Sequence, residues 1–327
     1  MVCSSEVFIM ELFLSILKAI VFGIIEGITE WLPVSSTGHL IIAEEFLGFS
    51  GRYGIDFSNL FIVVIQFGAI LAVLIAFFKK IWPFGKSKTK EEKKQTWMLI
   101  LNVVIACLPA VIVGVLFDDV VDQYLYGALV IAITLILFGI IFIVAEWYRK
   151  KHDTEDKTYL SLIDITWKSA LIIGLAQMVA IIPGVSRSGI TIIAALLIGF
   201  SRSSAAEFSF IISIPMIIGA SGFKLVKFVA SGDYHNIPSE LMSEAIVVLL
   251  VGVLVSFVVS IFTIKFFMTF IKSKTFAAFG YYRIGLGILV LILGLTQVIS
   301  LLPNVAINVS LDTLRSIDIL NLLPLRK

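Results

Sequence analysis

The stretch Pro183-Gly-Val-Ser-Arg-Ser-Gly-Ile-Thr191 decides how this chain folds. It places a proline, two glycines, three hydroxyl side chains and one arginine inside an apolar region that runs from 168 to 200. An arginine at membrane depth costs about 2.5 to 3.5 kcal/mol on an insertion scale unless an anion meets it. Non-helical backbone is tolerated at that depth only where it is buried in protein or lines a wet cavity. The stretch therefore predicts a broken helical hairpin with an anion site at its tip.

The composition of the whole chain predicts an integral membrane protein. Of the 327 residues 59% are hydrophobic and 15% are charged, whereas a soluble chain is about 45 to 50% apolar and about 25% charged. Only Cys3 and Cys107 are present, which excludes a disulfide-stapled secreted domain and a cysteine-based metal site. The net charge of +2 offers no polyanion-binding surface and argues against nucleic acid as a partner.

Six apolar stretches are long enough to cross the membrane as helices, which takes about 20 residues each. They run near 58 to 78, 97 to 117, 125 to 147, 204 to 229, 243 to 271 and 279 to 302. The linker at 79 to 95 holds seven lysines, while the connection at 118 to 124 holds three aspartates and no basic residue. By the positive-inside rule, the first is cytoplasmic and the second external. Two further apolar regions, 12 to 49 and 168 to 200, are interrupted by polar turns and are interpreted as re-entrant hairpins, entered from opposite sides.

An offset of 151 residues aligns the two interrupted regions. It places Ser35 on Ser186, Gly38 on Gly189 and Glu26 on Gln177. Three predicted crossings separate the two regions, so the second copy must be inverted, as in membrane folds whose broken helices meet near the midplane. The predicted fold is an all-α polytopic membrane protein with an inverted-topology repeat. Residues 1–150 form the first repeat, 151–302 the second and 303–327 a tail; a true start at Met10 stays open.

The first interrupted region carries Glu26 and Glu30, four residues apart and hence on one helical face. Two carboxylates this close in an apolar setting resist joint ionisation, so one holds a proton or both share a cation. The run Pro33-Val-Ser-Ser-Thr-Gly-His39 follows, and hydroxyls with backbone N–H groups at a helix N-terminus form an anion site. His39 beside it can exchange a proton or act as a nucleophile. The alternatives without a catalytic role are that Glu26 and Glu30 simply face water and that the hydroxyls of the run only cap a helix.

Three further polar side chains lie inside or beside apolar segments, and two of them, Arg187 and Arg283, have two interpretations each. Arg187 offers a guanidinium fork that suits a phosphate, and its alternative is an ion pair with Glu26 or Glu30. Arg283, beside two tyrosines, is either a second phosphate ligand or an anchor at the membrane interface. Gln66 is a further polar group within a predicted span.

The motif Glu26-Gly-x-x-Glu30-x-x-Pro-Val-Ser-Ser-Thr-Gly-His39, together with Pro183-Gly-x-Ser-Arg-Ser-x-x-Thr191, resembles the bacterial undecaprenyl-diphosphate phosphatase family, also known as bacitracin-resistance proteins. The resemblance implies removal of the terminal phosphate of undecaprenyl diphosphate at the outer face of the cytoplasmic membrane, which recycles the lipid carrier for peptidoglycan synthesis. It also implies a divalent cation, Mg²⁺ or Ca²⁺. The residues it implies as catalytic or phosphate-binding are Glu26, Glu30, Ser36, His39, Ser186, Arg187, Thr191 and, as a phosphate ligand, Arg283.

The resulting hypothesis makes Ser36 the nucleophile, with Glu30 or His39 as its base. Direct attack by His39 is second and attack by water third. Glu26 and Glu30 would hold the cation, and the polyprenyl tail would lie between helices among the membrane lipids. The side chains expected to bind phosphate, besides Arg187, are Ser35, Thr37, Ser186, Ser188, Thr191, Arg283 and Gln66. A homodimer stays open. The rival function is a secondary transporter or lipid flippase with an anion site at the midplane, because inverted repeats with broken helices are typical of transporters.

Overall fold

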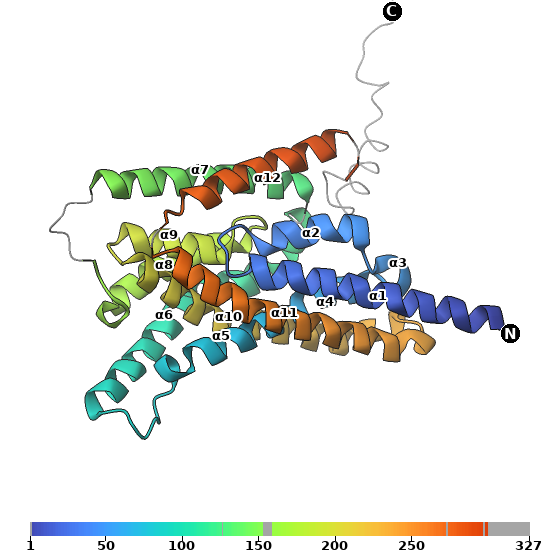
Figure 1. Ribbon diagram of the computed structural model, residues 1–327, viewed down its shortest axis with the longest axis horizontal. Coiled ribbons are helices and arrows are strands. Elements are labelled where there is room, and N and C mark those ends of the chain that lie inside the picture. The colour runs from blue at the N-terminus through green and yellow to red at the C-terminus, as the bar shows by residue number, and fades with distance from the viewer. Residues whose placement is uncertain (1, 126, 153–158, 273, 297, 300–327) are drawn as a thin grey trace, which may run out of the picture.

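The computed structural model describes residues 2–125, 127–152, 159–272, 274–296 and 298–299, and within them the chain is a bundle of helices (Figure 1). The α-helices are α1 (Val2–Thr29), α2 (Ser36–Leu47), α3 (Ser50–Tyr53), α4 (Ile55–Val64), α5 (Gln66–Ile81), α6 (Lys90–Tyr124), α7 (Ala128–Lys151), α8 (Trp167–Met178), α9 (Arg187–Leu197), α10 (Arg202–Ser231), α11 (Met242–Phe270) and α12 (Ala277–Leu295). Four 3-10 turns join them, η1 (Leu162–Asp164), η2 (Val179–Ile181), η3 (Asp233–Asn236) and η4 (Ser239–Leu241). The prediction of an all-α membrane protein is confirmed.

Seven helical stretches in the described residues are long and apolar enough to cross a membrane, counting α4 with α5 as one. Six of them correspond to the six predicted spans. The seventh is α1, which was expected to be a short hairpin arm from about residue 12 and instead forms 28 residues of helix. The apolar sequence before residue 12 continues the helix because no proline or glycine precedes Gly23.

The predicted boundaries fail at three other places. α6 continues to Tyr124, so the acidic segment at 118 to 124 is helical and not a connecting loop, since the first glycine after the apolar stretch is Gly127. The predicted span at 58 to 78 is two helices that meet at Ile65. α12 ends at Leu295 and not near 302. The predicted tail, 303–327, lies outside the described residues.

The tips of both interrupted regions share one backbone geometry. Ser35 (φ 76°) and Ser186 (φ 71°) are the non-glycine residues with positive φ in the described part of the chain. Each is the N-cap of the following helix, and its hydroxyl accepts the N–H of Gly38 or Gly189, respectively. Such a conformation is uncommon outside glycine. The same rare geometry at positions 151 residues apart is what an internal repeat predicts.

Three extensive helix contacts each join a helix of the first predicted half to a helix of the second. α1 packs along α11, α8 packs along α6, and α7 lies beside α12 along one flank of the bundle (Figure 1). Small residues let α7 and α12 approach closely, because a Cβ on Gly280 would lie 2.7 Å from the Gly139 carbonyl oxygen and one on Gly139 would lie 2.8 Å from that of Gly280. This contact fixes α12 along and around its axis, and α12 contributes to the site.

Two glycines of α12 test this packing. A Cβ on Gly287 would lie 2.7 Å from Ile136 Cγ1 and 2.8 Å from the Ala132 carbonyl oxygen, whereas one on Gly285 would meet no atom within 4 Å. We expect Gly287→Ala to destabilise the protein by about 1 to 3 kcal/mol through overpacking. Gly285→Ala should be neutral or slightly stabilising. Apparent unfolding temperatures in detergent measure both, and equal values would contradict the close α7–α12 contact.

Candidate active site

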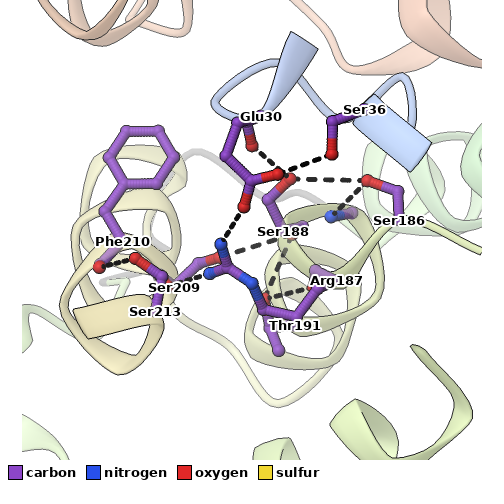
Figure 2. A network of polar contacts seen from close by, with 10 residues as sticks. Glu30, Ser36, Ser186, Arg187, Ser188, Thr191, Ser209, Phe210 and Ser213 are labelled. Atoms are coloured by element: carbon purple, nitrogen blue, oxygen red, sulfur yellow. Dashed lines mark hydrogen bonds and ion pairs between the residues drawn. The ribbon is translucent and has the colours of Figure 1, made fainter. Parts of the chain in front are cut away.

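The carboxylate of Glu30 joins the tips of the two interrupted regions. Glu30 follows the end of α1, Ser36 begins α2, and Arg187 begins α9. The Ser36 hydroxyl donates to Glu30 Oε2 at 2.6 Å, and Arg187 Nη2 donates to Glu30 Oε1 at 2.5 Å (Figure 2). Of the two acids that the sequence offered as partners for Arg187, Glu30 is the one in contact. A hydroxyl, a carboxylate and a guanidinium thus lie in one hydrogen-bonded line.

Side chains of α9 and α10 hold Arg187 and the second tip in place. Arg187 Nη1 donates to the Ser209 carbonyl oxygen at 3.0 Å, and the Thr191 and Ser209 hydroxyls lie 2.7 Å apart (Figure 2). The Ser188 hydroxyl donates to the Glu30 carbonyl oxygen at 3.2 Å. Ser188 and Thr191 are therefore engaged in joining the tips to each other and to α10.

Two helix N-termini meet at this site. α2 begins at Ser36 and α9 at Arg187, and the N-cap hydroxyls take up only the N–H groups of Gly38 and Gly189. In the described residues, the first two N–H groups of each helix, those of Ser36, Thr37, Arg187 and Ser188, have no hydrogen-bond acceptor. Free N–H groups and the positive ends of two helix dipoles favour an anion with several oxygens, such as a phosphate.

Glu26 lies one helical turn before Glu30 and is fully buried. Neither of its carboxylate oxygens has a hydrogen-bond partner in the described part of the chain. The burial follows from the close approach of α1 to α11, since a Cβ on Gly27 would lie 2.9 Å from the Ser256 carbonyl oxygen. A buried carboxylate without partners is costly unless it is protonated or meets a cation. In the described residues, no group of three or more acidic, histidine or cysteine side chains is placed to hold a metal ion. A hard cation held by Glu26 and Glu30 would have to take its other oxygen ligands from water and phosphate.

His39 lies on α2, one turn after Ser36, and both of its ring nitrogens are engaged. Nδ1 is 2.7 Å from the Ser35 carbonyl oxygen, and Nε2 is 2.7 Å from the hydroxyl of Tyr282 on α12. The His39 and Tyr282 rings stack with their planes 6° apart. His39 therefore lies next to the site and makes no hydrogen bond to Ser36.

Arg283 is not an exposed anchor at the membrane interface, and its Nε has no hydrogen-bond partner in the described residues. It is fully buried and donates to the carbonyl oxygens of Pro33 (3.3 Å), Gly184 (2.8 Å) and Val185 (2.9 Å). Its guanidinium lies 5.5 Å from the centre of the Phe142 ring. Arg283 thus ties the two tips together through their backbones. Thr134 of α7 adds a further hydrogen bond to the second tip, at the Pro183 carbonyl oxygen.

Comparison with known proteins identifies the family. The family model described as bacitracin resistance protein BacA matches residues 19–289. The chain belongs to this family. An undecaprenyl-diphosphatase of Enterococcus faecalis is 49% identical over 276 residues, which cover 84% of this chain and 96% of the relative. An undecaprenyl-diphosphatase of Streptococcus mutans is 45% identical over 288 residues, covering 88% and 99%. Undecaprenyl-diphosphatase 1 of Clostridioides difficile is 48% identical over 278 residues, covering 85% and 96%.

In this BacA-family chain the predicted site residues fall into three groups. Those drawn in the network of Figure 2 are Glu30, Ser36, Ser186, Arg187, Ser188 and Thr191. Those next to it in the chain or in space are Glu26, Thr37, Ser35, His39 and Arg283. Gln66 begins α5 after the break at Ile65 and makes no hydrogen bond to the network in the described residues.

The sequence interpretation left Ser209, Tyr282 and Thr134 out of the BacA-family site. Ser209 and Ser213 stand one turn apart in an apolar helix, which is a pattern that could have been noticed. Thr134 and Tyr282 stand on α7 and α12, and their contacts depend on how helices distant in sequence pack. No local pattern indicates them.

The role of Arg283 can be tested with Arg283→Lys. A lysine keeps the charge but cannot reach three carbonyl oxygens in two directions. Carbonyl groups left unpaired cost about 1 to 3 kcal/mol each when buried. We expect the apparent unfolding temperature of the substrate-free variant to fall clearly in detergent. Unchanged stability with a raised KM would instead indicate a phosphate ligand.

Proposed function

We propose that this protein hydrolyses undecaprenyl diphosphate to undecaprenyl phosphate and inorganic phosphate. The single observation that carries the proposal is the hydrogen-bonded row Ser36–Glu30–Arg187, which supplies a nucleophile, its base and a guanidinium that can bind phosphate. The names of the relatives, which align over nearly their whole length, support the same substrate. The physiological consequence would be recycling of the lipid carrier for peptidoglycan synthesis and resistance to bacitracin.

In the first step the Ser36 Oγ attacks the terminal phosphorus of the diphosphate. The Oγ–P bond forms as the bond between that phosphorus and the bridging oxygen breaks, and undecaprenyl phosphate leaves with the electron pair. Glu30 accepts the Ser36 proton, which it already binds at 2.6 Å. Arg187 turns from Glu30 to the incoming phosphate oxygens, which frees the carboxylate for the proton.

In the second step water attacks the phosphorus of the phosphoserine. The P–Oγ bond breaks, Glu30 returns its proton to Ser36 Oγ, and the proton that water gives up leaves with inorganic phosphate. Both steps are phosphoryl transfers, whose barriers fall mainly through positioning and charge neutralisation. The free N–H groups at the N-termini of α2 and α9 would donate hydrogen bonds to the phosphate oxygens and so neutralise part of their charge.

A divalent cation, Mg²⁺ or Ca²⁺, completes the proposal. Glu26 and Glu30 would hold it, and the unpartnered oxygens of Glu26 support this assignment. When bound, it would neutralise negative charge on the diphosphate. Glu26 would bind and orient the cation, whereas Glu30 would carry out the proton transfers.

The orientation in the membrane belongs to the same proposal. The lysine-rich linker at 79 to 95 supports a cytoplasmic location for that end of the bundle by the positive-inside rule, and the site would then open to the outer face of the cytoplasmic membrane. The two tips with matching positive-φ serines support an inverted repeat with re-entrant tips. Glu30, Ser36 and Arg187 come from one chain, so the chemistry does not require a homodimer.

A transporter or flippase needs an anion site but no nucleophile with a base. The hydrogen bond from Ser36 to Glu30 therefore favours the hydrolase over this rival. Hydrolysis also needs no closed membrane compartment. Purified protein in detergent separates the two functions.

We expect purified wild-type protein with Mg²⁺ to release phosphate from undecaprenyl diphosphate in detergent, and to lose this activity after chelation. Ser36→Ala should lower kcat by about a thousandfold or more, because the nucleophile is lost. Glu30→Gln should lower kcat by about a hundredfold or more, because the base is lost. Its matched control, Glu45→Gln on the exposed face of α2, should keep full activity. Phosphoenzyme trapped at Ser36 with labelled substrate would support the mechanism. Full activity of Ser36→Ala would exclude Ser36 as nucleophile, and absence of phosphate release by the wild type would exclude the function.

A further inference from the structure

We infer that Tyr282 is a positioning residue that holds His39 in a single neutral tautomer and, through His39, fixes the backbone of Ser35 at the mouth of the anion site. The inference deepens the proposed function and rests on it for its effect on catalysis. The contacts that support it lie between α12 and the first tip.

The two hydrogen bonds of His39 determine its tautomer. The Ser35 carbonyl oxygen accepts hydrogen bonds and cannot donate, so His39 Nδ1, 2.7 Å away, carries a hydrogen. In the neutral ring Nε2 then has the lone pair, and the Tyr282 hydroxyl donates to it at 2.7 Å. Ring stacking between the two residues, with centroids 5.7 Å apart, restricts rotation of the imidazole.

The neighbours of Tyr282 place its hydroxyl with precision. Arg283, the next residue, is fully buried and hydrogen-bonded to the carbonyl oxygens of both tips, including Pro33. Gly280, two residues earlier, lies against Gly139 of α7. α12 is thus locked on both sides of Tyr282, and the Tyr282–His39 contact follows from that register. Tyr282 is 49% exposed and the adjacent Tyr281 65%, so it is the hydrogen bond to His39, and not burial, that distinguishes Tyr282.

The Ser35 carbonyl oxygen is the target of this chain of contacts. Ser35 has φ 76°, and its hydroxyl and carbonyl oxygen both bind groups of the first turn of α2. A serine in this conformation is costly unless its surroundings hold it. The His39 Nδ1–H bond is one of the contacts that hold it, and it directs the free N–H groups of Ser36 and Thr37 at the site.

A consequence follows for the two bases that the sequence left open. With Nδ1 bound to the backbone and Nε2 bound to Tyr282, His39 has no free lone pair for the Ser36 proton. Glu30, which accepts the Ser36 hydrogen bond, is the base. His39 contributes to activity through geometry, and its loss and the loss of the Tyr282 hydroxyl should share one cause.

Nitrogen NMR of the full-length protein in detergent, labelled with ¹⁵N-histidine, tests the tautomer directly. The chain has three histidines, and His39→Gln identifies the His39 resonances by their disappearance. We expect wild-type His39 to be neutral with the hydrogen on Nδ1, and Tyr282→Phe to shift it towards a mixture of tautomers. A wild-type ring with hydrogen on Nε2, or on both nitrogens, would overturn the inference whether or not the variant folds.

The catalytic effect is measured as phosphate release from undecaprenyl diphosphate. Tyr282→Phe keeps the stacked ring and should lower kcat/KM by about five- to tenfold, the usual effect of losing one such hydrogen bond. Tyr281→Phe, its exposed neighbour, should leave kcat/KM unchanged. A shifted tautomer with unchanged kcat/KM would overturn the positioning role. If the wild type releases no phosphate, the proposed function fails, while the NMR result still decides the tautomer.

Discussion

The ion pair between Glu30 and Arg187 is the interaction on which the rest of this structure depends. Each tip by itself would place charged and hydroxyl side chains, together with backbone groups that lack helical hydrogen bonds, inside an apolar bundle. That is unfavourable. Together they satisfy each other, because Arg187 binds Glu30 and Ser188 binds the Glu30 carbonyl oxygen. Breaking a buried pair by removing one partner costs about 3 to 5 kcal/mol, since it leaves an uncompensated charge. The contact that allows the two tips to fold is also the contact that assembles the site.

The surrounding bundle divides the work between side chains that hold the tips and side chains left free for a ligand. Arg283 and Thr134 bind carbonyl oxygens of the tips, and Thr191 binds α10 through Ser209. Glu26 is the opposite case, a fully buried carboxylate without a partner in the described residues. The N–H groups at the starts of α2 and α9 are unpaired in the same region. The unpaired carboxylate of Glu26 suits a cation and the unpaired N–H groups suit an anion. Together they fit a phosphate that binds with a cation.

The sequence predicts the parts of this arrangement that have a local cause. Long apolar stretches predict helices, and glycine, proline and an isolated arginine predict the two tips, so the amino-acid sequence alone is enough to single out Glu30, Ser36 and Arg187. The predicted length of α1 and the predicted end of α6 were wrong because hydropathy marks where apolar residues stop and not where the backbone ceases to be helical.

Other contacts have a long-range cause. The sequence shows Arg283 beside two tyrosines and gives no indication of which carbonyl groups it will meet. Tyr282 and Thr134 escape prediction for the same reason, since their partners lie on α2 and on the second tip. The packing of α7 on α12 decides these contacts, and close approach at Gly139 and Gly280 sets that packing. Residues that act through tertiary register cannot be identified from one sequence without that register.

A double-mutant cycle on Glu30→Gln and Arg187→Gln, measured as apparent unfolding temperature in detergent, tests the central claim most directly. The claim is that each charge is stable inside the bundle because it is paired with the other, Glu30 being buried and Arg187 partly buried. It predicts that the double variant, which leaves neither charge unpaired, is more stable than at least one of the single variants, with a coupling of about 1 to 3 kcal/mol. Additive losses, with the double variant less stable than both single variants by the sum of their effects, would contradict it.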